Sequence, residues 1–244
     1  GGKKRGLQIC YNAPAPEVVE PYGFYSNPAR RLVELEIKLV ISEPKDVRIE
    51  IARLRQIKQL IEIEALQRAV DITGDTLAEV KQKLSQFKTE KELERAISSG
   101  FITYGGDGHG YEPIVASGKN ACVLHYNKNT DILHKNALTL LDVGALSDGY
   151  SADISRVWAI GTHTDKQKAV FEAVCALQDK AFSVLGPGVK LREYQKEMET
   201  YAFKALKKFG VKTDIYPHGF SHFLGLDVHD AGDYDAPLTP GSVI

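Results

Sequence analysis

The sequence is poor in cysteine, and its 3 cysteines form no recognisable motif. Cys10, Cys122 and Cys175 are widely separated along the 244 residues, and no CxxC pair occurs. A disulfide framework or a zinc ribbon is therefore not expected, and reduced thiols in a cytoplasmic protein are the default. The net charge is only −1 and the basic residues form no stripe, so we expect no nucleic-acid partner.

Long apolar runs are also absent. No stretch approaches the roughly 18 residues of a membrane-spanning helix, and the opening GGKKRGLQIC lacks a signal-peptide core. We therefore expect a soluble protein of the cytoplasm without a membrane partner. With 43% hydrophobic and 26% charged residues, the chain suits one or two globular domains with a substantial core.

The N-terminal part of the chain has a weak pattern. Prolines break up the first thirty residues into turns or loops. Residues 31–41 alternate apolar and charged side chains as a strand does, and apolar residues at every second position from Val47 to Ile51 predict another strand. We interpret residues 1–52 as a short N-terminal segment or the remnant of a larger domain, followed by a main domain over residues 53–244.

From residue 53 onward the apolar residues recur with helical and then strand-like periods. Helical stripes and two capping-box patterns, Thr89 with Glu92 and Thr164 with Gln167, predict four helices. The predicted helices cover 66–84, a segment beginning at 89, 164–184 and 191–209, and the strand-like pieces cover 111–118, 121–126, 138–146 and 150–161. The order of two helices, strands, two helices and more strand-like sequence is an α+β layout with a sign of internal duplication.

Two aspartates flank apolar, strand-like segments. Asp142 follows the run LTLL, and Asp153 comes after the turn-forming residues Ser147-Asp148-Gly149. An antiparallel pairing about that turn would bring the two carboxylates near each other. Two facing carboxylates in a half-buried site repel unless a cation lies between them, so a divalent metal ion is the simplest compensation. The alternative, in which each aspartate caps a turn or faces solvent, stays open here.

The segment HGFSHFLGLDVHD, from His218 to Asp230, contains three histidines. Its glycines and apolar residues predict strand and turn, so its spacing is unlike the helical HExxH of zinc proteases. His218 and His222 would share a face of a regular strand, whereas His229 would point the other way. A bend at Gly225 could redirect His229. Three histidines in a chain with paired aspartates favour a metal site over three structural histidines.

HGFSHFLGLDVHD closely resembles the signature of the aminopeptidase P and prolidase group within the pita-bread metallopeptidases. LLDVGALSDGYSADISR resembles the first metal-binding segment of that family, and YEPIVASGKNACVLHYNKN resembles the stretch that supplies an active-site histidine. The resemblance covers residues 53–244. It implies an α+β pita-bread fold with pseudo-duplicated halves of two helices and strands. Many relatives carry a creatinase-like N-terminal domain, of which residues 1–52 would be a remnant.

The resemblance also implies the metal ligands. Asp142 would chelate one ion, Asp153 would bridge two, and His222 would ligate the other. The family completes this dinuclear site with two glutamates that follow a stretch similar to LTPGSVI, and the sequence stops at Ile244 before either. We therefore expect the metallopeptidase domain to be incomplete at its C-terminus.

Three further histidines would bind substrate and assist proton transfer without binding metal: His125, His218 and His229. The implied activity is hydrolysis of the bond between an N-terminal residue and a following proline, with two divalent ions. Carboxylate-rich ligation favours Mn²⁺, with Co²⁺ or Zn²⁺ as alternatives. The implied partner is a peptide with proline at its second position. A dipeptidase of the prolidase type and a lapsed module that only binds peptides or proteins are alternatives, and a homodimer stays open.

Overall fold

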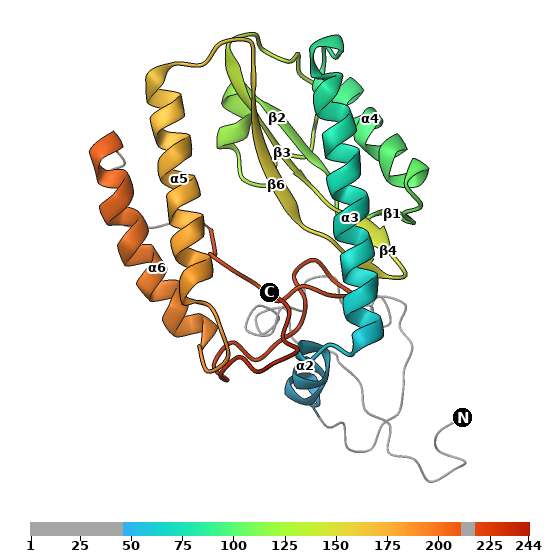
Figure 1. The fold of residues 1–244 in the computed structure, drawn as a ribbon, viewed down its shortest axis with the longest axis vertical. Coiled ribbons are helices and arrows are strands. Elements are labelled where there is room, and N and C mark those ends of the chain that lie inside the picture. The colour runs from blue at the N-terminus through green and yellow to red at the C-terminus, as the bar shows by residue number, and fades with distance from the viewer. Residues whose placement is uncertain (1–45, 211–217) are drawn as a thin grey trace.

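The computed structural model describes residues 46–210 and 218–244 (Figure 1). The strand expected over residues 31–41 lies outside this part of the chain. The α-helices are α2 (Arg48–Gln56), α3 (Leu60–Gln82), α4 (Glu90–Thr103), α5 (Asp165–Val184) and α6 (Leu191–Leu206), with 3-10 helices at Leu84–Gln86, Gly118–Cys122 and Lys207–Phe209. The strands are β1 (Gly108–His109), β2 (Ile114–Ser117), β3 (Ala137–Val143), β4 (Ala145–Ser147), β5 (Tyr150–Ser151) and β6 (Ile154–Ile160).

Helix α2 occupies the place where the sequence predicts a strand from Val47 to Ile51, so that prediction is wrong. Its buried residues are Ala52 and Gln56, one helical turn apart. Ala52 packs with Ala231 of the C-terminal segment. A short run of alternating apolar residues is compatible with a strand or with a helix. Here the contact between Ala52 and Ala231, far apart in the sequence, favours the helix.

The helix pair α3 and α4 confirms the predicted stripes. Leu66, Leu77 and Val80 of α3 are buried, and Thr89 caps α4 by accepting a 3.1 Å hydrogen bond from the Glu92 backbone N–H. The capping box is only half formed, because the Glu92 carboxylate accepts from the backbone N–H of Lys88 instead. These helices and the sheets enclose the first core, whose larger members include Leu93, Ile97, Phe101, Leu141, Val143 and Trp158.

The strands form two small antiparallel sheets, in the orders β1-β4-β5 and β2-β3-β6. The predicted hairpin is confirmed, because Ser147 opposes Tyr150 around a turn at Asp148-Gly149 and Asp142 opposes Ser155 further along. Between these pairings the ladder passes from one sheet to the other. There a Cβ on Gly144 would lie 1.7 Å from the carbonyl oxygen of Ala152.

The predicted strand over residues 121–126 is wrong. A 3-10 helix and an irregular turn take its place, and His125 has a left-handed backbone with φ of 53°. The Val123 backbone N–H bonds locally to the Asn120 carbonyl oxygen, and the Tyr126 hydroxyl donates to the Glu90 carboxylate, as described below.

Helices α5 and α6 form the second predicted pair, and Thr164 with Gln167 builds the predicted capping box. In Figure 1 this pair stands opposite α3 and α4, with the C-terminal segment running between the two pairs. The pair encloses a second core with residues from that segment: Leu177, Leu191, Tyr194, Met198, Phe223 and Leu238. No helix in the described ranges is long and apolar enough to cross a bilayer.

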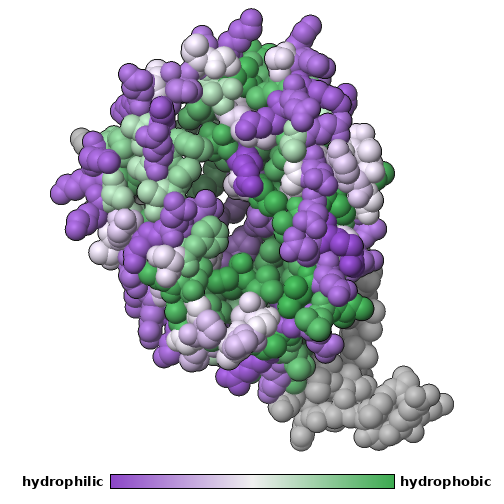
Figure 2. All heavy atoms as spheres, in the orientation of Figure 1, coloured by the Kyte–Doolittle hydropathy of each residue, from purple (hydrophilic) through white to green (hydrophobic). Residues whose placement is uncertain are grey.

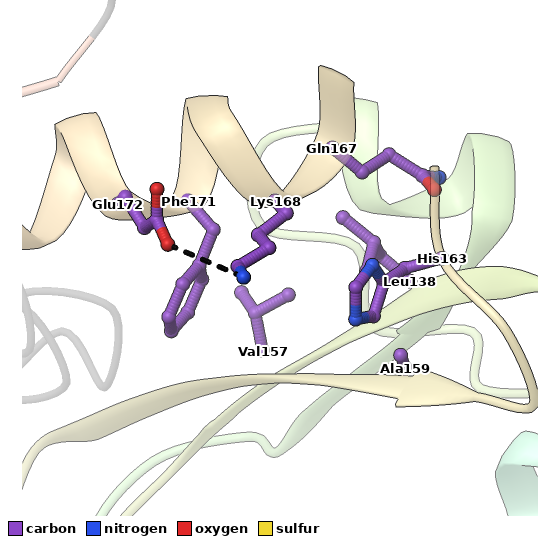
Figure 3. Close-up of a pocket in the computed structure, with 8 residues that line it drawn as sticks. All are labelled: Leu138, Val157, Ala159, His163, Gln167, Lys168, Phe171 and Glu172. Carbon is purple, nitrogen blue, oxygen red and sulfur yellow. Dashed lines mark ion pairs between the residues drawn. The ribbon is translucent and has the colours of Figure 1, made fainter. Parts of the chain in front are cut away.

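The predicted apolar stripe of α5 is buried at Leu177 but not toward the helix N-terminus. There Phe171 and Val174 are each 46% exposed. Phe171 lies over Leu138 of β3 and Val157 of β6 in a hollow of about 330 Å³ (Figure 3). Figure 2 shows the molecule hollowed near the middle of the same face, between the two helix pairs. A hollow with a mainly apolar surface thus separates the sheet from the N-terminal part of α5.

The histidine segment contains no strand over its described residues 218–230, so the predicted strand is wrong. Its backbone bonds to several separate partners: Ser151 N–H donates to Gly225 O, and Leu224 N–H donates to Val243 O. The Asp230 N–H turns back to the Phe223 carbonyl at 2.8 Å. The segment is a fastened loop, and its shape depends on contacts with both halves of the molecule.

Candidate metal centre

The six residues singled out in the sequence line one cleft of about 330 Å³: His125, Asp142, Asp153, His218, His222 and His229. The aspartates come from the hairpin β3–β6, beside the first core. Three of the histidines come from the loop that packs Phe223 into the second core. The cleft therefore lies where the two cores meet, and neither half contains the complete set.

The hairpin places both carboxylates on the same side of the sheet. Asp142 opposes Ser155, and Asp153 precedes Ser155 by two positions, so their side chains share a face. The hydroxyl of Tyr111 lies 2.8 Å from Asp142 Oδ1 and 3.0 Å from Asp153 Oδ1. A hydroxyl has one proton to donate, so Tyr111 can satisfy only one of the two carboxylates at a time.

The two carboxylates differ in their electrostatics. Burial, and then the nearby charge of Asp153, raise the pKa of Asp142. Burial also pushes the pKa of Asp153 upward, but the hydrogen bond and charge of His222 outweigh it and leave that pKa lowered. Burial and the two carboxylates raise the pKa of Tyr111 far above its usual value, so its hydroxyl stays protonated. Two full negative charges are therefore unfavourable in this confined place, and a cation between the carboxylates would relieve their repulsion.

His222 presents one ring nitrogen to this charge. Its Nε2 lies 3.1 Å from Asp153 Oδ2, and its Nδ1 lies 3.0 Å from the carbonyl oxygen of Phe223. A carbonyl oxygen only accepts, so Nδ1 carries a proton. Nε2 donates to Asp153 when the ring is protonated, and it offers a lone pair to a metal ion when that proton is lost. Burial lowers the pKa of His222, but the hydrogen bond to Asp153 and neighbouring interactions leave it raised overall. A histidine fixed in this way through its other nitrogen is typical of a metal ligand.

His229 adjoins the same place. Its ring centroid lies 4.2 Å from that of His222, and burial, followed by the charge of His222, lowers its pKa to about 4. Ligand atoms of Asp153, His222 and His229 all lie within 4.8 Å of one another. A carboxylate and two imidazole rings whose ligand atoms converge in this way are a donor set that fits a divalent cation. The geometry groups His229 with the ligands, whereas the sequence reading groups Asp142 with them.

His125 and His218 lie at the outer rim of the cleft. Both are exposed, and their ring centroids are 6.2 Å apart. His218 Nδ1 lies 3.0 Å from the carbonyl oxygen of Gly219. Their exposure leaves them accessible to a molecule that enters the cleft from solvent.

Two features of the site were missed in the sequence reading. Tyr111 stands at the head of the segment 111–118, and only the pairing of Ile114 with Asp142 shows that it reaches the aspartates. Asp230, next to His229, forms a 2.9 Å ion pair with Lys58, and both side chains are 1% exposed. Asp230 was visible in the sequence as the residue that closes the histidine segment, but its partner lies far away in the chain.

The Lys58–Asp230 pair fastens the histidine loop to the start of α3. Lys58 also donates to the carbonyl oxygen of Arg55 at 2.6 Å, and the Arg55 guanidinium pairs with Asp230. A Cβ on Gly225 would lie 2.1 Å from Asp230 Oδ2. Gly225 is therefore needed for this close approach, and the chain also bends at Gly225, as the sequence argument expected.

Comparison with known proteins identifies the family of this chain and several relatives. The model of metallopeptidase family M24 matches residues 64–244. Intermediate cleaving peptidase 55 of Saccharomyces cerevisiae is 32% identical over 82% of this chain and 41% of its own length. Human Xaa-Pro aminopeptidase 3 is 30% identical over 97% of this chain and 49% of its own length.

A solved structure is similar as well. The zinc-substituted aminopeptidase P of Escherichia coli in complex with product has 29% sequence identity and a TM-score of 0.75, over 82% of this chain and 49% of that chain. The fold is therefore the pita-bread fold of aminopeptidase P. The chain spans about half the length of the curated relatives it matches. It belongs to metallopeptidase family M24.

Proposed function

We propose that the protein hydrolyses the peptide bond between an N-terminal residue and a following proline, with divalent metal ions held in the cleft. The observation that carries this proposal is the meeting of Asp153, His222 and His229 within 4.8 Å of one another, beside Asp142. Relatives that bear the name Xaa-Pro aminopeptidase support the choice of bond.

In this proposal Asp142, Asp153 and His222, which line the same cleft, would hold the ions. Mn²⁺ suits the carboxylate-rich donor set, and Co²⁺ or Zn²⁺ are alternatives. Bound there, the ions would supply Lewis-acid activation of water and of the scissile carbonyl. Tyr111 donates its hydrogen bond to the carboxylates and keeps them oriented.

The histidines handle substrate and protons. His229 is neutral near pH 7 because its pKa is lowered to about 4, so it can donate a hydrogen bond to a carbonyl oxygen on which negative charge develops. His125 and His218 at the rim bind the peptide and deliver a proton to the leaving proline nitrogen. That nitrogen becomes a secondary amine and cannot leave without this proton.

A proline at the second position has a physical rationale. An Xaa-Pro bond has no N–H, and the ring fixes its own φ, so a site that recognises extended backbone through that N–H cannot bind it. Ile114 and Val228 line the cleft beside the histidines. Their apolar surface would contact the pyrrolidine ring.

The test is turnover of a peptide series by the Mn²⁺-loaded protein. We expect cleavage of Xaa-Pro-Xaa tripeptides, none of the matched Xaa-Ala-Xaa peptides, and none by Asp153→Asn. Asp148→Asn is the matched control, since Asp148 is an exposed turn residue of the same hairpin, and it should keep full turnover. Cleavage of Xaa-Pro dipeptides alone would instead assign a prolidase. Binding of the peptides without turnover would indicate a lapsed module.

A further inference from the structure

The carboxylate of Glu90, the first residue of α4, is completely buried. Its Oε1 accepts hydrogen bonds from the Ser117 backbone N–H at 2.8 Å and from Asn120 Nδ2 at 2.9 Å. Its Oε2 accepts from the Tyr126 hydroxyl at 2.7 Å and from the Asp131 backbone N–H at 2.9 Å. One carboxylate therefore accepts from four donors, which belong to the last residue of β2 and to the segment that leads from it to β3.

These donors bracket His125 on both sides. Ser117 and Asn120 precede it, Tyr126 follows it directly, and Asp131 closes the segment. His125 itself has a left-handed backbone, with φ of 53°, that a residue with a Cβ rarely adopts. Such a conformation persists only when the surroundings impose it. The four bonds to Glu90 are the part of the surroundings that fixes the chain on either side of His125.

A second tether, at Asn129, joins the same segment to β2 and to the residue before β2. Asn129, 2% exposed, accepts from the Val115 backbone N–H at 2.9 Å and donates to the carbonyl oxygen of Pro113 at 2.8 Å. This tether ties the later part of the segment to the start of β2 but does not reach the residues next to His125. Asn127, two residues after His125, also donates to Glu112 Oε2 at 2.7 Å, but that bond is exposed. Glu90 is the buried group that holds the chain on both sides of His125.

We propose that Glu90 is a positioning residue, whose buried carboxylate holds the segment 117–131 so that His125 faces the cleft. The effect of Glu90 on turnover rests on the proposed function. Its effect on the structure of segment 117–131 does not. Glu90 touches no reacting group and acts through His125 alone.

Glu90→Gln tests this without changing the size of the side chain. The amide keeps one acceptor oxygen and replaces the other with an NH₂ donor, which would face two of the four donors. An NH₂ at the Oε1 position loses the Ser117 N–H bond, and an NH₂ at the Oε2 position loses the Asp131 N–H bond and keeps Tyr126 only if that hydroxyl turns to accept. At least one backbone N–H therefore loses its acceptor whichever way the amide lies. Tyr126→Phe removes a single bond and leaves the carboxylate in place. Thr164→Ala, which removes the cap of α5, is the control for a general loss of stability.

The first readout is amide hydrogen exchange of the full chain, which needs no activity. We expect exchange within 117–131 to accelerate at least about tenfold in Glu90→Gln and less in Tyr126→Phe, with no local change in Thr164→Ala. Unchanged exchange in this segment would overturn the proposal. If Glu90→Gln does not fold, the same measurement on Tyr126→Phe decides.

The second readout is a double-mutant cycle with His125. We expect Glu90→Gln to lower kcat/KM for an Xaa-Pro tripeptide by about 10- to 100-fold, and to have less than about a twofold effect once His125 is alanine. An equal loss in both backgrounds would show a general structural role and contradict positioning through His125. If the unaltered protein has no turnover, the proposed function fails, while hydrogen exchange still decides the role of Glu90.

Discussion

The Nε2 atom of His222 lies 3.1 Å from Oδ2 of Asp153, and this contact joins the two halves of the molecule. Asp153 belongs to the hairpin on the first core, and His222 precedes Phe223, which fills the second core. The metal centre is therefore assembled at a junction. Changes that loosen either half should weaken metal binding even where they touch no ligand.

Tyr111→Phe should weaken Mn²⁺ binding by about tenfold, because the hydroxyl that orients both carboxylates is lost. The chain without metal should also lose about 1–3 kcal/mol of unfolding free energy, the usual worth of a hydrogen bond to a charged group. Calorimetric titration and urea unfolding in EDTA measure the two effects. Tyr104→Phe is the matched control, since its hydroxyl bonds to Glu79 at the surface. Equal Mn²⁺ affinity in both variants would remove Tyr111 from the site.

Asp230→Asn and Lys58→Met should each destabilise the protein by about 3–5 kcal/mol, because each leaves a buried charge without its main partner. The double variant should recover part of that loss, since the Lys58 and Asp230 charges are both gone while Arg55 keeps its ion pair with Asp227. Urea unfolding of the four proteins gives the coupling free energy directly. Strictly additive losses would mean that the pair does not hold the histidine loop to the start of α3.

Gly144→Ala should destabilise the protein by about 3 kcal/mol, because the added Cβ would lie 1.7 Å from the backbone carbonyl oxygen of Ala152. The change lies at the bend between the two sheets, against Ala152, the residue that precedes Asp153. Gly74→Ala is the contrasting variant, since a Cβ there meets nothing within 4 Å inside helix α3. It should stabilise the fold by about 0.5–1 kcal/mol. Thermal unfolding that ranks the two variants in the opposite order would contradict this packing.

Glu62 should make the protein sensitive to acid. Its carboxylate accepts from the Gln59 backbone N–H and then from the Tyr150 hydroxyl, and these bonds hold its pKa below the usual 4.5. A carboxyl whose folded pKa is depressed contributes stability above its unfolded pKa, and this is lost as the pH falls through the folded value. Urea midpoints of Glu62→Gln should therefore fall less than those of the unaltered protein as the pH drops below 4.5. Parallel curves would count against the linkage.

The parts of the fold that sequence predicts well are governed by neighbours in the chain. The α3 stripe, the Thr164 cap and the Asp148-Gly149 turn depend on residues within a few positions, so their patterns are visible without a structure. The hairpin turn also predicted that Asp142 and Asp153 approach each other. The resemblance pointed to the histidine segment, and the structure places its three histidines in the same cleft.

The failures share one physical cause. The segments 121–126 and 218–230 have strand-like composition, but distant elements hold them in other shapes. The Tyr126 hydroxyl donates to Glu90, the Asp230 carboxylate pairs with Lys58, and the Gly225 carbonyl oxygen accepts from the Ser151 backbone N–H. No local sequence pattern indicates contacts with residues so far away in the chain. Tyr111 was missed for the same reason, because only the register of β2 against β3 shows what its hydroxyl reaches.

The most direct measurement is calorimetric titration of Mn²⁺ into the metal-free protein and into Asp153→Asn, His222→Ala and the control Asp148→Asn. We predict that the protein and Asp148→Asn bind Mn²⁺ with equal affinity, and that each of the other two variants binds at least about tenfold more weakly. Affinity that is unchanged in Asp153→Asn and His222→Ala would contradict the metal centre described here.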